Sequence, residues 1–106
     1  MGVDSPLIEE IVRRVLQVAQ PDRIILFGSA AAGQMTPDSD IDLLVVEPSP
    51  SDVRRESVAI GDALRGLGFP FDVLVIGTER FEETKEVFGG IAYPAHRDGR
   101  VIYEAA

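Results

Sequence analysis

The sequence predicts an α/β fold in which helices flank a small mixed sheet of about four strands. Two observations predict it. Short apolar runs alternate along the chain with segments whose apolar residues recur at helical spacing, which is the pattern of strands alternating with helices. The first two apolar runs are separated by about a dozen residues without a full crossover helix, so we expect these strands to run antiparallel. Residues 1–106 are expected to form one domain.

The first elements follow from capping residues and periodicity. Ser5-Pro6 begins the first helix, because serine caps helices and proline fits the first helical position. Pro21-Asp22 ends that helix, and residues 23–27 form a strand that is buried on both faces. The apolar residues of the helix share one face: Ile8, Ile11, Val12, Val15 and Ala19.

The middle of the chain predicts a strand followed by a helix. Residues 30–32 favour a short helical turn that Gly33 ends, and residues 36–39 have the composition of a loop. Residues 41–46 form the second strand. Ser51-Asp52 caps the next helix, which ends in a segment rich in helix-breaking residues: Gly66, Gly68 and Pro70.

The last third predicts two more strands and two more helices. Residues 71–76 form the third strand, and Thr78 caps a helix that extends from Glu79 to Phe88. The Gly89-Gly90 pair then interrupts the chain. Two short elements follow it, a helix over residues 91–97 and a final strand over residues 100–103.

Composition restricts the classes of function. The chain is 45% hydrophobic and 26% charged, values that are ordinary for a globular protein in water. Its formal net charge is −8, which argues against a nucleic-acid polymer as partner, because the phosphate backbone requires clustered basic residues. No secretory signal is visible, and no apolar stretch approaches the roughly 20 residues of a membrane span. We expect a cytoplasmic protein without membrane contact.

Two carboxylates stand at the start of the second predicted strand. Asp40 and Asp42 are separated by one residue, so their side chains project from the same face, about 6.5–7 Å apart along the backbone. Mg²⁺ is usually held by one or two carboxylates together with substrate phosphates. Gly28 and Ser29, just after the first strand, supply the complementary half, since a glycine lets backbone N–H groups approach a phosphate. We therefore expect Asp40 and Asp42 to bind metal, and Gly28 and Ser29 to bind nucleotide phosphates.

Asp72 is a third candidate, at the start of the third strand in an otherwise apolar segment. If that strand pairs with the second one, Asp72 lies beside Asp40 and Asp42, because neighbouring strands are about 4.8 Å apart. Three carboxylates would accommodate two Mg²⁺ ions about 3.5–4 Å apart. Asp40 and Asp42 would hold the ion on the nucleotide phosphates, and Asp72 would help to hold a second ion or would itself act as the base. Such a cluster suits phosphoryl or nucleotidyl transfer.

These residues resemble a known family. Phe27-Gly28-Ser29, the spacer of ten residues, Asp40-Ile41-Asp42 and the later Asp72 are similar to the motifs of minimal nucleotidyltransferases, within the DNA polymerase β-like superfamily. The resemblance covers most of the chain, including its closing segment, residues 97–104. It implies the nucleotidyltransferase fold, which is similar to the polymerase β palm.

The resemblance also implies an activity and a partner. Members of the family bind Mg²⁺ and a nucleoside triphosphate, usually ATP, and transfer AMP to a hydroxyl. Asp40, Asp42 and Asp72 match the catalytic and metal-binding positions. Minimal domains that stand alone are often antitoxins, which bind and adenylylate a HEPN-domain toxin on a tyrosine. The resemblance therefore implies a HEPN-type protein partner, in an assembly whose homo- or hetero-oligomeric form the sequence leaves open.

The sequence departs from the family in one respect. Many members carry arginines after the Gly-Ser pair, whereas this chain has Ala30-Ala31-Ala32. Without an arginine there, less positive charge is available for a triphosphate, so weakened activity is one interpretation. A second interpretation is an inactive binding module that neutralises its partner by forming a complex. A third is the catalytic subunit of a small-molecule nucleotidyltransferase, whose acceptor site another chain completes.

Overall fold

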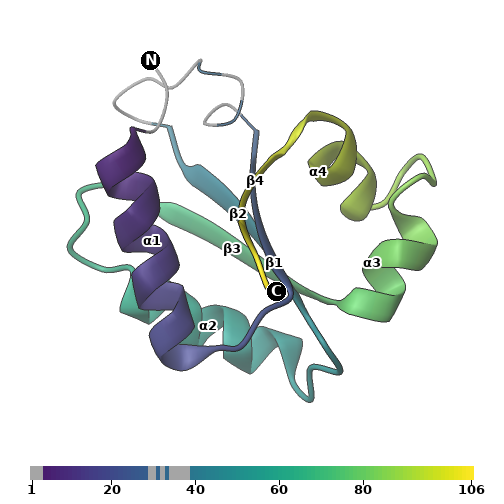
Figure 1. The fold of residues 1–106 in the computed structure, drawn as a ribbon, viewed down its shortest axis with the longest axis horizontal. Helices are drawn as coiled ribbons and strands as arrows, with labels where there is room; N and C mark the ends of the chain where they lie inside the picture. The colour runs from purple at the N-terminus through teal and green to yellow at the C-terminus, as the bar shows by residue number, and fades with distance from the viewer. Residues whose placement is uncertain (1–3, 29–30, 32, 34–38) are drawn as a thin grey trace.

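The order of helices and strands is that of the predicted α/β class. The computed structural model describes residues 4–28, 31, 33 and 39–106. Figure 1 shows a sheet with helices on both sides. In chain order the elements are α1 (Ser5–Val18), β1 (Arg23–Phe27), β2 (Ile41–Glu47), α2 (Val53–Ala63), β3 (Phe71–Gly77), α3 (Thr78–Thr84), α4 (Ala92–Asp98) and β4 (Arg100–Glu104).

The sheet is mixed, and this confirms the predicted class. Its four strands lie in the order β3-β2-β1-β4. β1 is antiparallel to both β2 and β4, as expected for the first two strands from their short connection. β2 and β3 are parallel, with α2 as the crossover between them. This parallel pair brings the beginnings of β2 and β3 to the same end of the sheet.

Each face of the sheet packs against its own pair of helices. On one face, Leu43 and Val45 of β2 are buried with apolar residues of α1 and with Ile60 of α2. On the other face, Leu44 and Val46 are buried with side chains of α3 and α4. Because alternate residues of a strand point to opposite faces, burial on both faces requires a continuous apolar run. The residues of β2 after Asp42 are accordingly apolar without interruption up to Val46.

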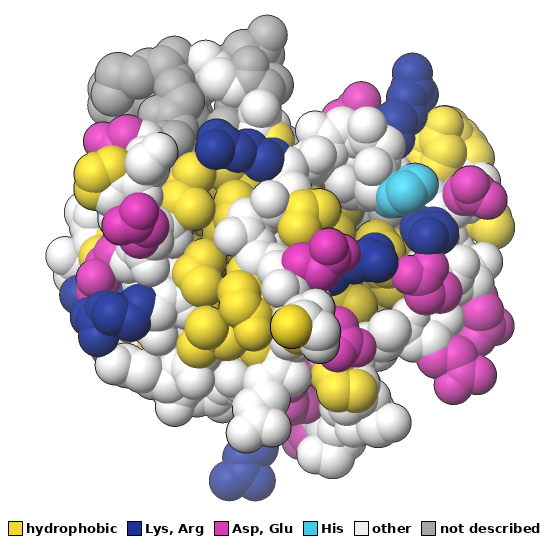
Figure 2. Space-filling model, in the orientation of Figure 1, with side chains coloured by type: hydrophobic (Ala, Val, Ile, Leu, Met, Phe, Trp, Pro, Cys, Tyr) yellow, Lys and Arg dark blue, Asp and Glu magenta, His cyan; other side chains and the backbone are white. Residues whose placement is uncertain are grey.

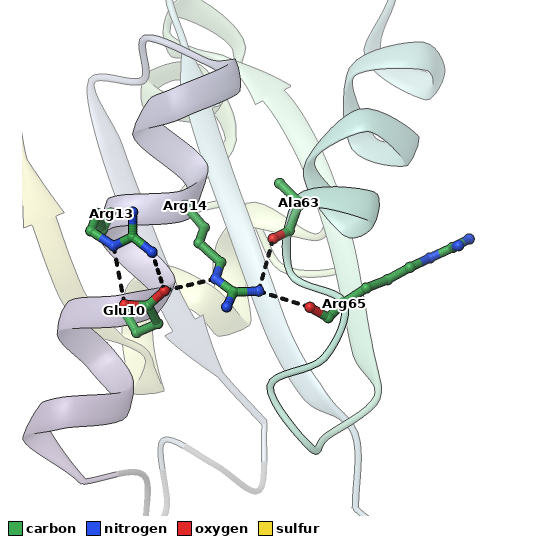
Figure 3. A network of polar contacts seen from close by, with 5 residues as sticks. All are labelled: Glu10, Arg13, Arg14, Ala63 and Arg65. Carbon is green, nitrogen blue, oxygen red and sulfur yellow. Dashed lines mark hydrogen bonds and ion pairs between the residues drawn. The ribbon is translucent and has the colours of Figure 1, made fainter.

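A polar network ties α1 to the end of α2 (Figure 3). Glu10 accepts hydrogen bonds from Arg13 and Arg14, and these contacts lower the pKa of Glu10 to about 2. The Arg14 guanidinium also donates to the backbone oxygens of Ala63 and Arg65, the latter at 2.7 Å. Carbonyl groups at a helix C-terminus lack partners within the helix, so Arg14 satisfies those of α2.

Three local predictions were wrong. α1 is capped by Asp4, whose Oδ1 accepts from the Leu7 amide, and not by Ser5. Thr78 does not cap α3, because its hydroxyl donates to Asp22, far away in the sequence. α3 ends at Thr84 and does not extend to Phe88. The cap of α2 at Asp52 is confirmed. The predicted turn over 30–32 and the loop over 36–39 fall largely outside the described residues.

Candidate functional site

The structure brings the three predicted aspartates to one end of the sheet. Asp42 of β2 and Asp72 of β3 are direct partners in the parallel register. Asp40 precedes the first residue of β2 and lies two residues before Asp42. In a strand, residues two apart share a face, so Asp40 and Asp42 project to the side of the sheet that α3 and α4 cover. The sequence predicts that Asp72 lies near Asp40 and Asp42 if its strand pairs with theirs. β3 does pair with β2.

The three carboxylates repel one another. The pKa of Asp42 is raised, first because burial disfavours its charged form and then because Asp72 and Asp40 are negatively charged. Asp42 is partly buried, whereas Asp40 and Asp72 are exposed. None of the ion pairs formed between described residues includes these aspartates. A cation bound here would relieve the repulsion.

Gly28 lies directly against this cluster. Phe27, the last residue of β1, is the register partner of Asp42, so Gly28 begins the turn beside the carboxylates. Its φ of 70° lies in the left-handed region that favours glycine. A Cβ built on Gly28 would collide with Oδ2 of Asp42. The glycine is therefore required both by its backbone conformation and by the closeness of Asp42. Ser29 lies outside the described residues.

The backbone conformation of Gly28 and its closeness to Asp42 predict that one added methyl group destabilises the fold. Gly28→Ala is expected to lower the free energy of unfolding by more than the roughly 1–2 kcal/mol of left-handed backbone strain, because the methyl group also displaces Asp42. Gly66→Ala is the matched control. Gly66 has a φ of 88°, but no atom lies within 4 Å of the place its methyl group would take, so it measures backbone strain alone. Urea denaturation of both variants measures the difference. Equal losses would show that Asp42 does not crowd Gly28.

The donor set fits a hard cation, although the described side chains do not form a complete metal site. No group of three acidic, histidine or cysteine residues in the described part of the chain is arranged to hold one ion. The oxygens available at Asp40, Asp42 and Asp72 are carboxylate oxygens, which Mg²⁺ prefers, and Mg²⁺ commonly completes its coordination with substrate phosphates and water. Burial, and then the negative charges of Asp72 and Asp40, raise the pKa of Asp42, so a positive charge at this position would stabilise its carboxylate.

Comparisons with known proteins agree with this geometry. The family model for a nucleotidyltransferase domain matches residues 8–97, a range that contains Gly28 and all three aspartates. No curated protein matches the chain. Within the described part of the chain, no helix has the length and apolar composition that a membrane span requires.

Two solved structures share the fold. One is described as the crystal structure of a toxin-antitoxin with AMP-PNP; it has a TM-score of 0.73 and 18% identity, over 92% of this chain and 73% of that one. The other, from Sulfolobus solfataricus, is assigned as a nucleotidyltransferase; it has a TM-score of 0.55 and 20% identity, over 98% of this chain and 92% of that one. At these identities the likeness concerns the fold.

Proposed function

The chain belongs to the nucleotidyltransferase domain family, and on this basis we propose that it transfers AMP from ATP to a hydroxyl group in a Mg²⁺-dependent reaction. One observation carries the proposal. Asp42 and Asp72 are register partners on parallel strands, with Asp40 on the same face as Asp42 and Gly28 packed against the Asp42 carboxylate. A family match, a carboxylate cluster and a glycine turn therefore coincide at one end of the sheet.

Each residue has a distinct task in this proposal. Asp40 and Asp42 would hold Mg²⁺, with Asp72 contributing to a second ion. When bound, Mg²⁺ neutralises phosphate charge and favours attack at phosphorus. Gly28 and Ser29 would place backbone N–H groups against the triphosphate, because no side chain at Gly28 obstructs the approach. The hydroxyl oxygen of the acceptor bonds to the α-phosphorus and pyrophosphate leaves. Alternatively, Asp72, the exposed member of the register pair, would accept the hydroxyl proton itself instead of holding the second ion.

We further propose that the acceptor hydroxyl belongs to a toxin of the HEPN type. The toxin-antitoxin structure with AMP-PNP, which shares this fold, supports a toxin as partner, and the HEPN type is what the family resemblance implies. The surface offers a second line of support. Figure 2 shows acidic side chains gathered over α3, and the segment just after it exposes Val87 and Phe88. Phe88 is 86% exposed, and apolar side chains rimmed by charge are common at protein interfaces.

A second candidate function is binding without catalysis. Its specific support is the absence of arginine at Ala30-Ala31-Ala32, which leaves the triphosphate without a nearby cationic side chain from that segment. In that case the chain would inhibit its partner by forming a complex. The two functions differ in whether inhibition requires the aspartates.

Nucleotide binding is the first test. A saturating non-hydrolysable ATP analogue with Mg²⁺ is expected to raise Tm by about 10–20 °C at 100 times Kd, because the ligand binds only the folded form. The measurement is a thermal melt, with the analogue in EDTA as control. A Tm that does not respond to the analogue and Mg²⁺ at millimolar concentration would contradict a nucleotide site.

The transferred group is the second test. The chain is incubated with a co-expressed HEPN-type protein and ATP labelled at either the α- or the γ-phosphate. AMP transfer retains the α-label on the acceptor and releases the γ-label with pyrophosphate. Retention of the γ-label would instead indicate phosphoryl transfer and would overturn the proposed reaction.

A further inference from the structure

A polar pocket lies at the opposite end of β2 from the aspartates. It has a volume of about 430 Å³, and its wall includes Glu47 at the end of β2, Glu56 of α2 and the C-terminal end of α1. Glu47 is five residues beyond Asp42, which is about 17 Å along an extended strand. The odd-numbered residues of β2 face α1 and α2, so Glu47 also lies on the other face of the sheet from Asp42. Figure 1 shows the end of α1 beside α2 in this region.

Glu47 is in an environment that does not satisfy a carboxylate. Glu47 is only 6% exposed. Within the described part of the chain, it is the one charged residue that is this deeply buried. Oε2 of Glu47 is buried without a hydrogen-bond partner, and so is Oε2 of Glu56. A buried charged group without a partner costs several kcal/mol, so native proteins rarely retain one without a compensating ion.

The two carboxyl groups also face each other. Burial raises the pKa of Glu47 to about 7, and the negative charge of Glu56 adds to the rise, as does the hydrogen bond that a proton shared between the two carboxyl groups would form. Two carboxylates accept hydrogen bonds but cannot donate them, so the pair requires a proton or a cation between its oxygens. A divalent cation would neutralise both groups at once, whereas a proton neutralises one.

The rest of the wall also offers hydrogen-bond acceptors, beside apolar side chains of α1. The C-terminal end of α1 forms part of the wall. The last carbonyl groups of a helix lack partners within the helix and form the negative end of its dipole. Gln17 and Gln20 add side-chain amides, whose oxygens are further candidate ligands. Among the described residues that line the pocket, none is basic.

We propose that this pocket is a binding site for a hard divalent cation of the calcium class, with Glu47 and Glu56 as its carboxylate ligands. Ca²⁺ takes six to eight oxygen ligands in flexible geometry, drawn from carboxylates, amide and backbone carbonyls, and water. Mg²⁺ demands a near-ideal octahedron, whereas the oxygens here come from three separate elements, an arrangement that suits the more flexible coordination of the larger ion. A monovalent organic cation would leave one of the two carboxylates uncompensated.

The test is a Ca²⁺ titration followed by thermal melting at about pH 8, where Glu47 has lost its proton. Ca²⁺ without nucleotide is expected to raise the Tm of Asp42→Asn, but not that of Asp42→Asn combined with Glu47→Gln or with Glu56→Gln. The Asp42→Asn variant separates this pocket from the aspartate cluster. If Glu47→Gln does not fold, Glu56→Gln, whose side chain is less buried, still decides the outcome.

Competition between Ca²⁺ and protons for Glu47 and Glu56 gives an independent readout, which is measured in the Asp42→Asn variant. Glu47 and Glu56 are the titratable groups of the described pocket wall, since α1 contributes none there. The affinity for Ca²⁺ should therefore fall by up to about tenfold per pH unit below 7, as Ca²⁺ displaces the shared proton. The proposal is overturned if millimolar Ca²⁺ does not raise the Tm of Asp42→Asn, if adding Glu47→Gln to this variant leaves the response unchanged, or if spermidine stabilises and Ca²⁺ does not.

Discussion

Asp42→Asn is expected to reduce AMP transfer by about 10²–10³-fold without unfolding the protein. Asp42 is the aspartate that both of the others influence electrostatically, and it lies between the Asp72 register position and the Gly28 turn. Asparagine keeps nearly the same shape but removes the charge that would attract Mg²⁺. The measurement is retention of the α-label on the acceptor, in single-turnover reactions with wild type and variant.

The stability of the same variant shows whether lost activity reflects lost charge or a lost fold. The pKa of Asp42 is raised in the folded chain, so ionisation of Asp42 destabilises the fold as pH rises through that pKa. The stabilising contribution of protonated Asp42 is fully present below the pKa that Asp42 has in the unfolded chain. It disappears once the pH exceeds the pKa of Asp42 in the folded chain. In EDTA near neutral pH, Asp42→Asn should therefore have a Tm equal to or above that of the wild type.

A matched control is available on the surface of α2. Asp62 forms an exposed ion pair with Arg65 at 3.1 Å, and α2 covers the face of the sheet opposite the one to which Asp42 points, so Asp62→Asn should leave transfer unchanged. If Asp42→Asn retained transfer while its Tm matched the wild type, Asp42 would not be part of the catalytic machinery. If transfer disappeared but the partner were still inhibited, the binding function would replace the enzymatic one.

Phe81→Ala is expected to have the largest effect on stability, a loss of about 3–5 kcal/mol in the free energy of unfolding. Phe81 of α3 is 1% exposed and is the largest side chain of the apolar cluster between the sheet and α3 and α4. The Arg23 guanidinium lies over its ring, 5.7 Å from the centroid, and the His96 ring meets it edge-on at 6.4 Å. Removal of the ring leaves a cavity and ends both contacts.

Phe88→Ala is the control for this substitution, because it removes the same ring from an exposed position. Its cost should be at most about 1.5 kcal/mol, the contribution of its edge-to-face contact with Tyr93. Urea denaturation of both variants gives the comparison. A loss below about 1 kcal/mol for Phe81→Ala would mean that the α3–α4 layer does not contribute to the cooperative core.

The two capping predictions failed for different physical reasons. Asp4 and Ser5 are both residue types that cap helices; the sequence pattern favoured Ser5 because Pro6 follows it, but the local hydrogen bond to the Leu7 amide comes from Asp4. Thr78 has the right chemistry for a cap, but its hydroxyl hydrogen-bonds instead to Asp22, which lies on the segment leading into β1. The choice at Thr78 depends on which partner the folded chain brings near, so neighbours in the sequence do not fix it.

The amino-acid sequence by itself determined the α/β class, the position of each strand, the antiparallel course of β1 and β2, and Asp40, Asp42, Asp72 and Gly28 as candidates. Each of these depends on periodicity, connection length or residue type within a short window. Only the tertiary structure decided that β3 lies parallel to β2 in the register that pairs Asp72 with Asp42. It alone placed Glu47 against Glu56, because contacts between strand and helix arise when the chain packs and local sequence does not encode them.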